Sequence, residues 1–105
     1  MTSEERYREL VKGFLGKPDV SQDGRGFGSS SLKVRGRIFA MLSSRGEFVV
    51  KLPRHRVDAL VASGEGDRYD PGRGRQMKEW LAVRDSSGDD WQGLAEEALR
   101  FVGAR

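Results

Sequence analysis

The sequence has 105 residues, of which 36% are hydrophobic, and its 19 basic and 16 acidic residues give a formal net charge of +3. This length is typical of one domain, so we expect a single domain over residues 1–105. There is no cysteine, which excludes disulfides, thiolate metal sites and cysteine nucleophiles. No stretch resembles a transmembrane segment or a signal peptide, and we expect a cytoplasmic protein with no membrane partner.

The first predicted element is a helix over residues 2–16. Thr2 and Glu5 have the spacing of a capping box, in which each side chain accepts a hydrogen bond from the other residue's backbone N–H. Apolar residues recur at helical spacing and form one face: Tyr7, Leu10, Val11, Phe14 and Leu15. Gly16 and Pro18 then end the helix. Residues 17–31 are predicted to be a loop, and their glycine spacing matches no phosphate-binding motif.

A three-stranded antiparallel meander is predicted between residues 27 and 52. Three short apolar runs are separated there by Arg-Gly pairs at 35–36 and 45–46. A residue followed by glycine between two such runs is a hairpin signal, because glycine adopts positive φ without steric cost. Two loops of two residues each would join the three strands.

The register of this meander assigns its side chains to two faces. With two-residue loops, Val34 pairs with Arg37, and Ser44 pairs with Glu47. Because alternate side chains point to opposite faces, the face that we expect to lie under the helices carries Leu32, Val34, Phe39, Met41, Phe48, Val50 and Leu52. The opposite face carries Lys33, Ile38, Ala40, Leu42, Val49 and Lys51. This outer face is too apolar to be only a solvent surface, and we expect a shallow groove or a homodimer contact on it, through Ile38, Leu42 and Val49.

The second half of the chain is predicted to hold a short helix over residues 53–63. Proline suits a first helical position, as at Pro53, and Gly64 and Gly66 would end the helix. A loop over residues 67–78 and a strand over 79–84 follow.

A final helix is predicted after a turn, with Asp89 or Asp90 as its N-cap. It carries an apolar stripe: Trp91, Leu94, Ala95, Ala98, Leu99 and Val102. The element order is helix, three strands, helix, one or two strands, helix. The fold class is therefore α+β, a two-layer domain with an antiparallel sheet and helices packed on one face.

Several basic residues are candidates for contact with nucleic acid. The loop over 67–78 combines arginines and a lysine with Tyr69, a pattern typical of contact with a nucleic-acid backbone and stacking on a base, but also of an ordinary solvated loop. Its densest basic part is Arg73 and Arg75. The full set of candidates is Arg35, Arg37, Arg54, Arg56, Arg73, Arg75 and Lys78.

Four stretches resemble a known family. They are Phe27-Gly28, Lys33-Val34-x-Gly36-x-Ile38-Phe39-Ala40-Met41, Val50-Lys51-Leu52 and Met77-Lys78-Glu79-Trp80-Leu81. In these stretches the chain resembles the TfoX N-terminal-like proteins and the related YjbR-like (MmcQ) proteins. The resemblance implies a two-layer α+β domain with a strongly curved antiparallel sheet, and a role as a DNA-associated regulatory module. No catalytic motif comes with this family.

Little in the composition favours catalysis. The sequence holds one histidine and no cysteine, and no paired-carboxylate motif or metal-ligand spacing is evident. We therefore expect no enzyme, no cofactor, no metal and no small-molecule substrate. The sequence predicts a small non-catalytic binding protein, with DNA or RNA as its partner. The alternative is a protein–protein interaction adaptor or a homodimeric module that uses the outer sheet face.

Overall fold

The computed structural model describes residues 2–22, 31–72, 74, 76–84 and 90–104. The elements in chain order are α1 (Ser3–Phe14), β1 (Val20–Gln22), β2 (Leu32–Val34), β3 (Arg37–Leu42), β4 (Phe48–Lys51), α2 (Arg54–Ala62), β5 (Gly66–Tyr69), β6 (Met77–Val83) and α3 (Trp91–Gly103). The α+β prediction is confirmed. The strand β1 was not predicted, since it lies in the predicted loop over 17–31. The strands β5 and β6 agree with the prediction of one or two strands after the second helix, although most of β5 lies in the predicted loop over 67–78.

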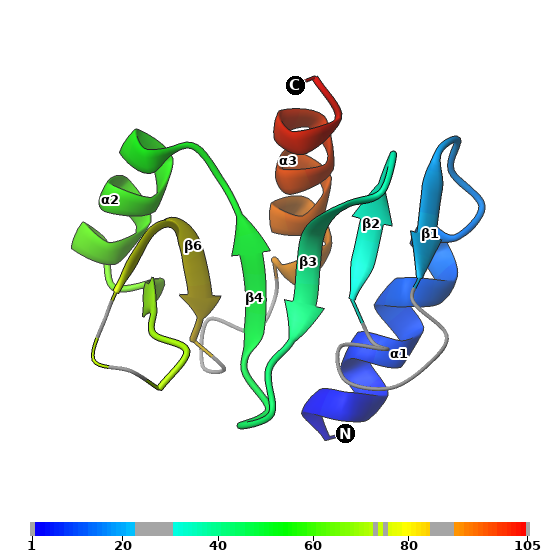
Figure 1. Cartoon of the computed structure of the whole chain (residues 1–105). Helices are drawn as coiled ribbons and strands as arrows, with labels where there is room; N and C mark the ends of the chain where they lie inside the picture. The colour runs from blue at the N-terminus through cyan, green and yellow to red at the C-terminus, as the bar shows by residue number, and fades with distance from the viewer. Residues whose placement is uncertain (1, 23–30, 73, 75, 85–89, 105) are drawn as a thin grey trace.

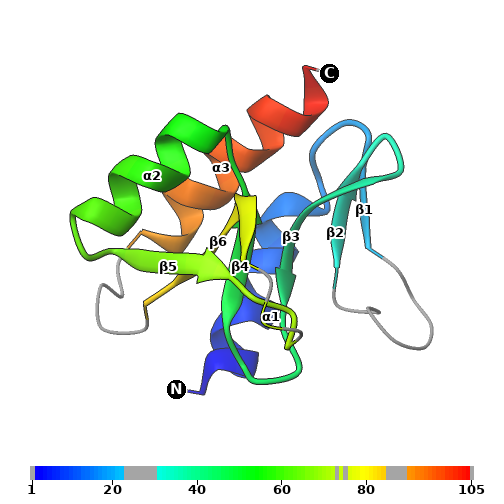
Figure 2. The same ribbon diagram turned by 60° about the vertical axis from the view of Figure 1, so that its left-hand side comes forward.

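The described strands form one six-stranded sheet in the order β1-β2-β3-β4-β6-β5, and all of its pairs are antiparallel. After β4 the chain passes through α2 and forms β5 at the edge of the sheet. It then returns as β6, which lies between β4 and β5 (Figure 1). Figure 2 shows that β5 runs across the direction of β2 and β3, so the sheet is strongly twisted.

The core lies between one face of the sheet and all three helices. It unites apolar side chains of α1, α2 and α3 with side chains of β2, β3, β4 and β6 in a single cluster. Trp91 of α3 stacks on Phe48 of β4, with ring centroids 4.5 Å apart, and the Arg6 guanidinium lies 4.2 Å from the Trp91 ring centroid. Helices packed on one face of the sheet are thus confirmed. No helix in the described part of the chain has the length and apolar character needed to cross a membrane.

The start of α1 forms as the sequence predicts. The Glu5 N–H donates to Thr2 Oγ1 at 3.1 Å, and the Thr2 N–H donates to Glu5 Oε1 at 2.9 Å. The hydrogen bonds from Thr2 lower the pKa of the Glu5 carboxyl below its usual value. The end of the helix differs from the prediction, because α1 stops at Phe14 and Leu15 is 44% exposed rather than part of the core.

The first hairpin has the predicted register. Val34 pairs with Arg37, and the two loop residues Arg35 and Gly36 have φ values of 52° and 81°. Positive φ at both positions matches the twist of the flanking strands. The Arg35 backbone N–H also donates to the Asp19 carbonyl at 3.0 Å, which ties this turn to the start of β1.

The predicted register of the second hairpin is wrong by one residue. Leu42 pairs with Phe48, and the Ser43 N–H donates to the Glu47 carbonyl at 2.8 Å, so the loop consists of residues 44–46. The Ser43 hydroxyl stabilises this longer loop, since it accepts hydrogen bonds from the backbone N–H groups of Arg45 and Glu47 at 3.2 and 3.1 Å. A serine side chain of this kind competes with the shorter turn that glycine alone suggests.

A β-bulge in β3 changes the predicted faces as well. Lys33 pairs with Ile38, whereas Leu32 pairs with Ala40, so Phe39 is an extra residue in β3. Phe39 and Ala40 are consequently both buried in the core. Beyond the bulge the alternation is reversed, and the predicted faces of three residues are wrong. Ala40 and Leu42 belong to the helix side, and Met41 lies on the outer face, paired with Val49.

One further prediction needs correction. Gly66 does not end α2 but lies in β5, opposite Val83 of β6. Of the two predicted N-caps of α3, Asp90 occupies the N-cap position without a capping hydrogen bond from its side chain, and Asp89 lies outside the described residues.

Candidate functional site

A hollow lies between β3 and β4 at the end of their paired segment. The two strands pair only over residues 40–42 and 48–50, and Figure 1 shows them diverging beyond that point, with α3 visible between them. A bulge bends its strand and increases the local twist, which accounts for this divergence. The hollow has a volume of about 480 Å³, and Val102 of α3 is among its lining residues.

The hollow is cationic. It is lined by Lys33 of β2, Arg37 and Ile38 of β3, Lys51 of β4 and Trp80 of β6, together with Gly36 and Val102. Three of these side chains are positively charged, and no described residue that lines the hollow is acidic. Charges of one sign around a concavity reinforce one another, because its low-dielectric walls focus the field. The site therefore favours an anion.

Trp80 links this hollow to a second one. The indole is half-buried, and Lys51 Nζ lies 5.3 Å from its ring centroid. Lys51 and Trp80 also line a neighbouring hollow of about 820 Å³, with Pro71, Gln76, Met77, Lys78 and Glu79. We call the combined surface the Trp80 surface and define it by Lys33, Arg37, Ile38, Lys51, Lys78 and Trp80.

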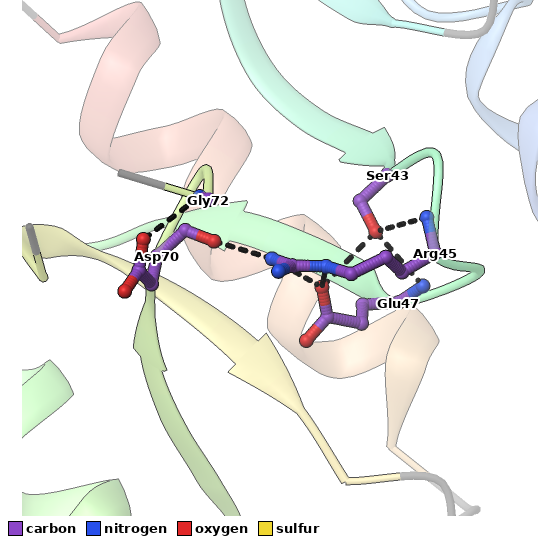
Figure 3. Close-up of polar contacts among 5 residues, drawn as sticks. All are labelled: Ser43, Arg45, Glu47, Asp70 and Gly72. Atoms are coloured by element: carbon purple, nitrogen blue, oxygen red, sulfur yellow. Dashed lines mark hydrogen bonds and ion pairs between the residues drawn. The ribbon is translucent and has the colours of Figure 1, made fainter. Parts of the chain in front are cut away.

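Pro71 and Gln76, which lie between β5 and β6, form one wall of the second hollow, and Arg45 contacts the residue that precedes Pro71 (Figure 3). From the β3–β4 turn, the Arg45 guanidinium donates to the Asp70 carbonyl and to Glu47 Oε1, the latter at 3.0 Å. The Asp70 carboxylate accepts the Gly72 N–H at 2.8 Å. These contacts fix both sides of Pro71, which lines the hollow.

A third hollow differs in charge. It has a volume of about 430 Å³ and lies beside the start of α1, where Glu4, Glu47 and Arg45 are among its lining residues. Carboxylates and a guanidinium are mixed there, so this hollow has no comparable preference for an anion.

The predicted nucleic-acid residues do not form one site. Arg37 and Lys78 lie on the Trp80 surface. Arg35 is at the tip of the first hairpin, where its Nε is 3.4 Å from Asp19 Oδ2. Arg54 is exposed at the start of α2. Arg73 and Arg75 lie outside the described residues, so their candidacy stays a prediction.

Arg56 is engaged elsewhere. Its Nε and Nη2 donate to the two carboxylate oxygens of Glu97, each at 2.9 Å, which joins α2 to α3. These hydrogen bonds from Glu97 raise the pKa of Arg56. The Arg56 guanidinium therefore links α2 to α3, and two of its N–H donors are already bonded to the Glu97 carboxylate.

Lys33, Lys51 and Trp80 line the hollow but are not among the binding residues that the sequence predicts. Period-two alternation places both lysines on the outer face. The signal that could have found the site is the pairing of Lys51 with Trp80 across β4 and β6. That pairing joins segments far apart in the sequence, and no local pattern reports it.

The predicted partner-binding residues also separate. Ile38 lies in the cationic hollow. Leu42 packs against the core on the helix side, so its predicted place on the outer face is wrong. Val49 lies on the outer face but is 0% exposed, so it cannot contact a partner in this conformation. These positions give no continuous apolar docking surface.

No family model, curated protein or solved structure matches the chain. The resemblance to the TfoX N-terminal-like and YjbR-like proteins therefore stays a prediction. Within the described residues, no three histidine, aspartate or glutamate side chains gather where they could hold a metal ion.

Proposed function

We propose that the protein is a non-catalytic nucleic-acid-binding module, and that the Trp80 surface is its contact site. One observation carries this proposal. Three cationic side chains and a half-buried tryptophan line the same hollow, and no acidic residue is among the described lining residues. A DNA-associated regulatory role, as the resemblance implies, belongs to the same proposal, and so does a cytoplasmic location.

The chemistry of the surface suits both parts of a nucleotide. Lys33, Arg37 and Lys51 offer charge-assisted hydrogen bonds to phosphate oxygens, which supply most of the sequence-independent affinity of nucleic-acid-binding proteins. The Trp80 ring offers a flat face for a base, and such stacking tolerates any sequence. We therefore expect binding that depends strongly on salt and weakly on sequence.

The test measures fluorescence anisotropy of labelled DNA and RNA oligonucleotides at low and moderate salt. The triple variant Lys33→Ala/Arg37→Ala/Lys51→Ala should bind more weakly. Its plot of log affinity against log salt should be shallower by about 2, since each lost phosphate contact on a single strand removes roughly 0.7 from the slope. The matched control is Arg8→Ala, which removes an exposed cation from α1 and should leave affinity nearly unchanged.

Two results would contradict the proposal. One is the absence of retention of any oligonucleotide at low salt by the native chain. The other is a loss in Arg8→Ala of about one third of the loss in the triple variant, both as log affinity, because three equivalent charges would then explain the triple variant without a site. The first result would direct attention to a protein partner.

A further inference from the structure

We infer that the ligand of the Trp80 surface is an unpaired strand, with one base stacked on Trp80 and its phosphates on the flanking cations. This inference rests on the proposed function, and it narrows the ligand from nucleic acid in general to single-stranded DNA or RNA. The shared chemistry is an exposed base on an anionic backbone.

The shape of the site is the first argument. The hollow between β3 and β4 has a volume of about 480 Å³ and is open to solvent, so it has room for one nucleotide of a longer chain without enclosing it. In a duplex, both faces of a base are covered by its neighbours, so the base must leave the stack before it can lie on an aromatic side chain. Trp80 is half-buried on β6, between β4 and β5 in the sheet, and favours a base that is already free.

The arrangement of the charges is the second argument. Lys33 and Arg37 line the first hollow, and Lys78 lines the second together with the one carboxylate, Glu79. Lys51 and Trp80 are shared by both hollows, so cations outnumber the carboxylate along the described lining. A backbone that follows the cations therefore passes the indole on its way from one hollow to the other. A cationic path with an aromatic side chain along it is the design of proteins that bind single strands.

The rest of the fold supports the same ligand. Duplex readers insert an α-helix or a β-ribbon into the major groove, which is about 12 Å wide. All three helices contribute to the core on the opposite side of the sheet, and α3 supplies only Val102 to the first hollow. The Arg45 contacts hold one wall of the second hollow before any ligand is bound, and a prepared wall reduces the entropic cost of binding.

The experiment is a competition assay on the native chain. A labelled single strand of about a dozen nucleotides is displaced by unlabelled single-stranded DNA, by single-stranded RNA of the same sequence, and by the matched duplex. We expect either single strand to compete at least about tenfold better than the duplex. The DNA and RNA arms show which sugar the surface prefers, and a preference for either supports the inference.

Variants of Trp80 provide the second readout. Trp80→Ala should weaken single-strand binding by roughly 5-fold to 150-fold, the range of stacking on one base, and Trp80→Phe should keep most of the affinity. Thermal unfolding of each variant checks that it folds. Tryptophan fluorescence of the native protein should also be quenched by the single strand, and Trp80 is the source, because Trp91, the other of the two tryptophans, is 3% exposed beneath Arg6.

The outcomes separate the two proposals. If neither strand nor duplex binds at low salt, the proposed function and this inference both fail. If the duplex competes as well as the single strand, the nucleic-acid site stands and the unpaired ligand is wrong. If Trp80→Ala and the fluorescence show no effect while the triple variant still weakens binding, the nucleic-acid site also stands, and the base stacked on Trp80 is wrong. A non-folding Trp80→Ala leaves the fluorescence and the competition to decide.

Discussion

Arg37 and Arg56 are both basic residues that the sequence marks for nucleic-acid contact, yet their surroundings differ. Arg37 is exposed beside a cationic hollow. Arg56 forms a bidentate pair with Glu97, and the two side chains are 39% and 31% exposed. A guanidinium whose donors already meet a carboxylate has less to offer to a phosphate. The neighbouring side chains therefore decide whether an arginine links two helices, as Arg56 does, or is available to an anion, as Arg37 is.

Exchanging these two residues for alanine should give opposite results. Arg56→Ala should lower the free energy of unfolding by at most about 1 kcal/mol, because a half-exposed ion pair is screened by solvent, and should leave nucleic-acid affinity unchanged. Arg37→Ala should weaken binding and leave stability unchanged. Urea denaturation and the anisotropy assay measure the two quantities. Equal losses of affinity in the two variants would show that the assay reports charge and not the site.

Gly66 and Gly13 differ in the space that the surrounding elements leave for a side chain. Gly66 lies in β5 against β6, and a Cβ there would be 2.6 Å from the Ala82 carbonyl oxygen and 2.9 Å from Leu81 Cδ1. Gly13 lies in α1, and a Cβ there would meet nothing within 4 Å. The close approach of two strands requires the first glycine, whereas the helix gains nothing from the second.

The pair Gly66→Ala and Gly13→Ala tests this difference at the scale of the element. Gly66→Ala should destabilise the fold by roughly 1–3 kcal/mol, since backbone atoms must move to admit a methyl group. Gly13→Ala should stabilise it by about 0.5–1 kcal/mol through higher helix propensity. Chemical denaturation of both variants gives the free energies. An unchanged free energy of unfolding in Gly66→Ala would contradict the close packing of β5 against β6.

The core joins all three helices to four strands of the sheet, and Tyr7 of α1 is one of its buried residues. Its ring lies 6.0 Å from that of Phe48 across the interface between α1 and the sheet. Burial raises the pKa of the Tyr7 phenol, and a hydrogen bond from the Leu32 backbone offsets part of this effect. The folded protein therefore keeps this proton at a pH at which the unfolded chain loses it.

A pH dependence of the whole molecule follows. The contribution of Tyr7 to stability is present below the ordinary tyrosine pKa of 10.0 and is lost as pH rises above it, because the folded state then binds more protons than the unfolded state. The loss approaches about 1.4 kcal/mol per pH unit. Urea denaturation of the native chain and of Tyr7→Phe at about pH 9 and about pH 11 measures it. A stability difference between the two proteins that does not change with pH would contradict this prediction.

Local patterns in the sequence were enough to predict much of the architecture. Helical spacing predicted three helices, and Thr2 with Glu5 predicted the start of α1, because these signals act within one or two helical turns. The positive φ of Gly36 follows from its place in a two-residue turn, and it gave the correct register for the first hairpin. These features depend on neighbours along the chain.

The site, by contrast, was decided by the tertiary structure. Phe39 packs against Phe14 of α1, with ring centroids 5.9 Å apart, and Ala40 is also buried in the core. Placing two successive residues of β3 on the same side requires a bulge. The pairing of β4 with β6 places Lys51 beside Trp80, and the hollow between β3 and β4 adds Lys33 to them. The sequence by itself determined which residues are cationic or aromatic. Only the tertiary structure decided that these three meet, because strand pairing and packing join segments that are far apart in the sequence.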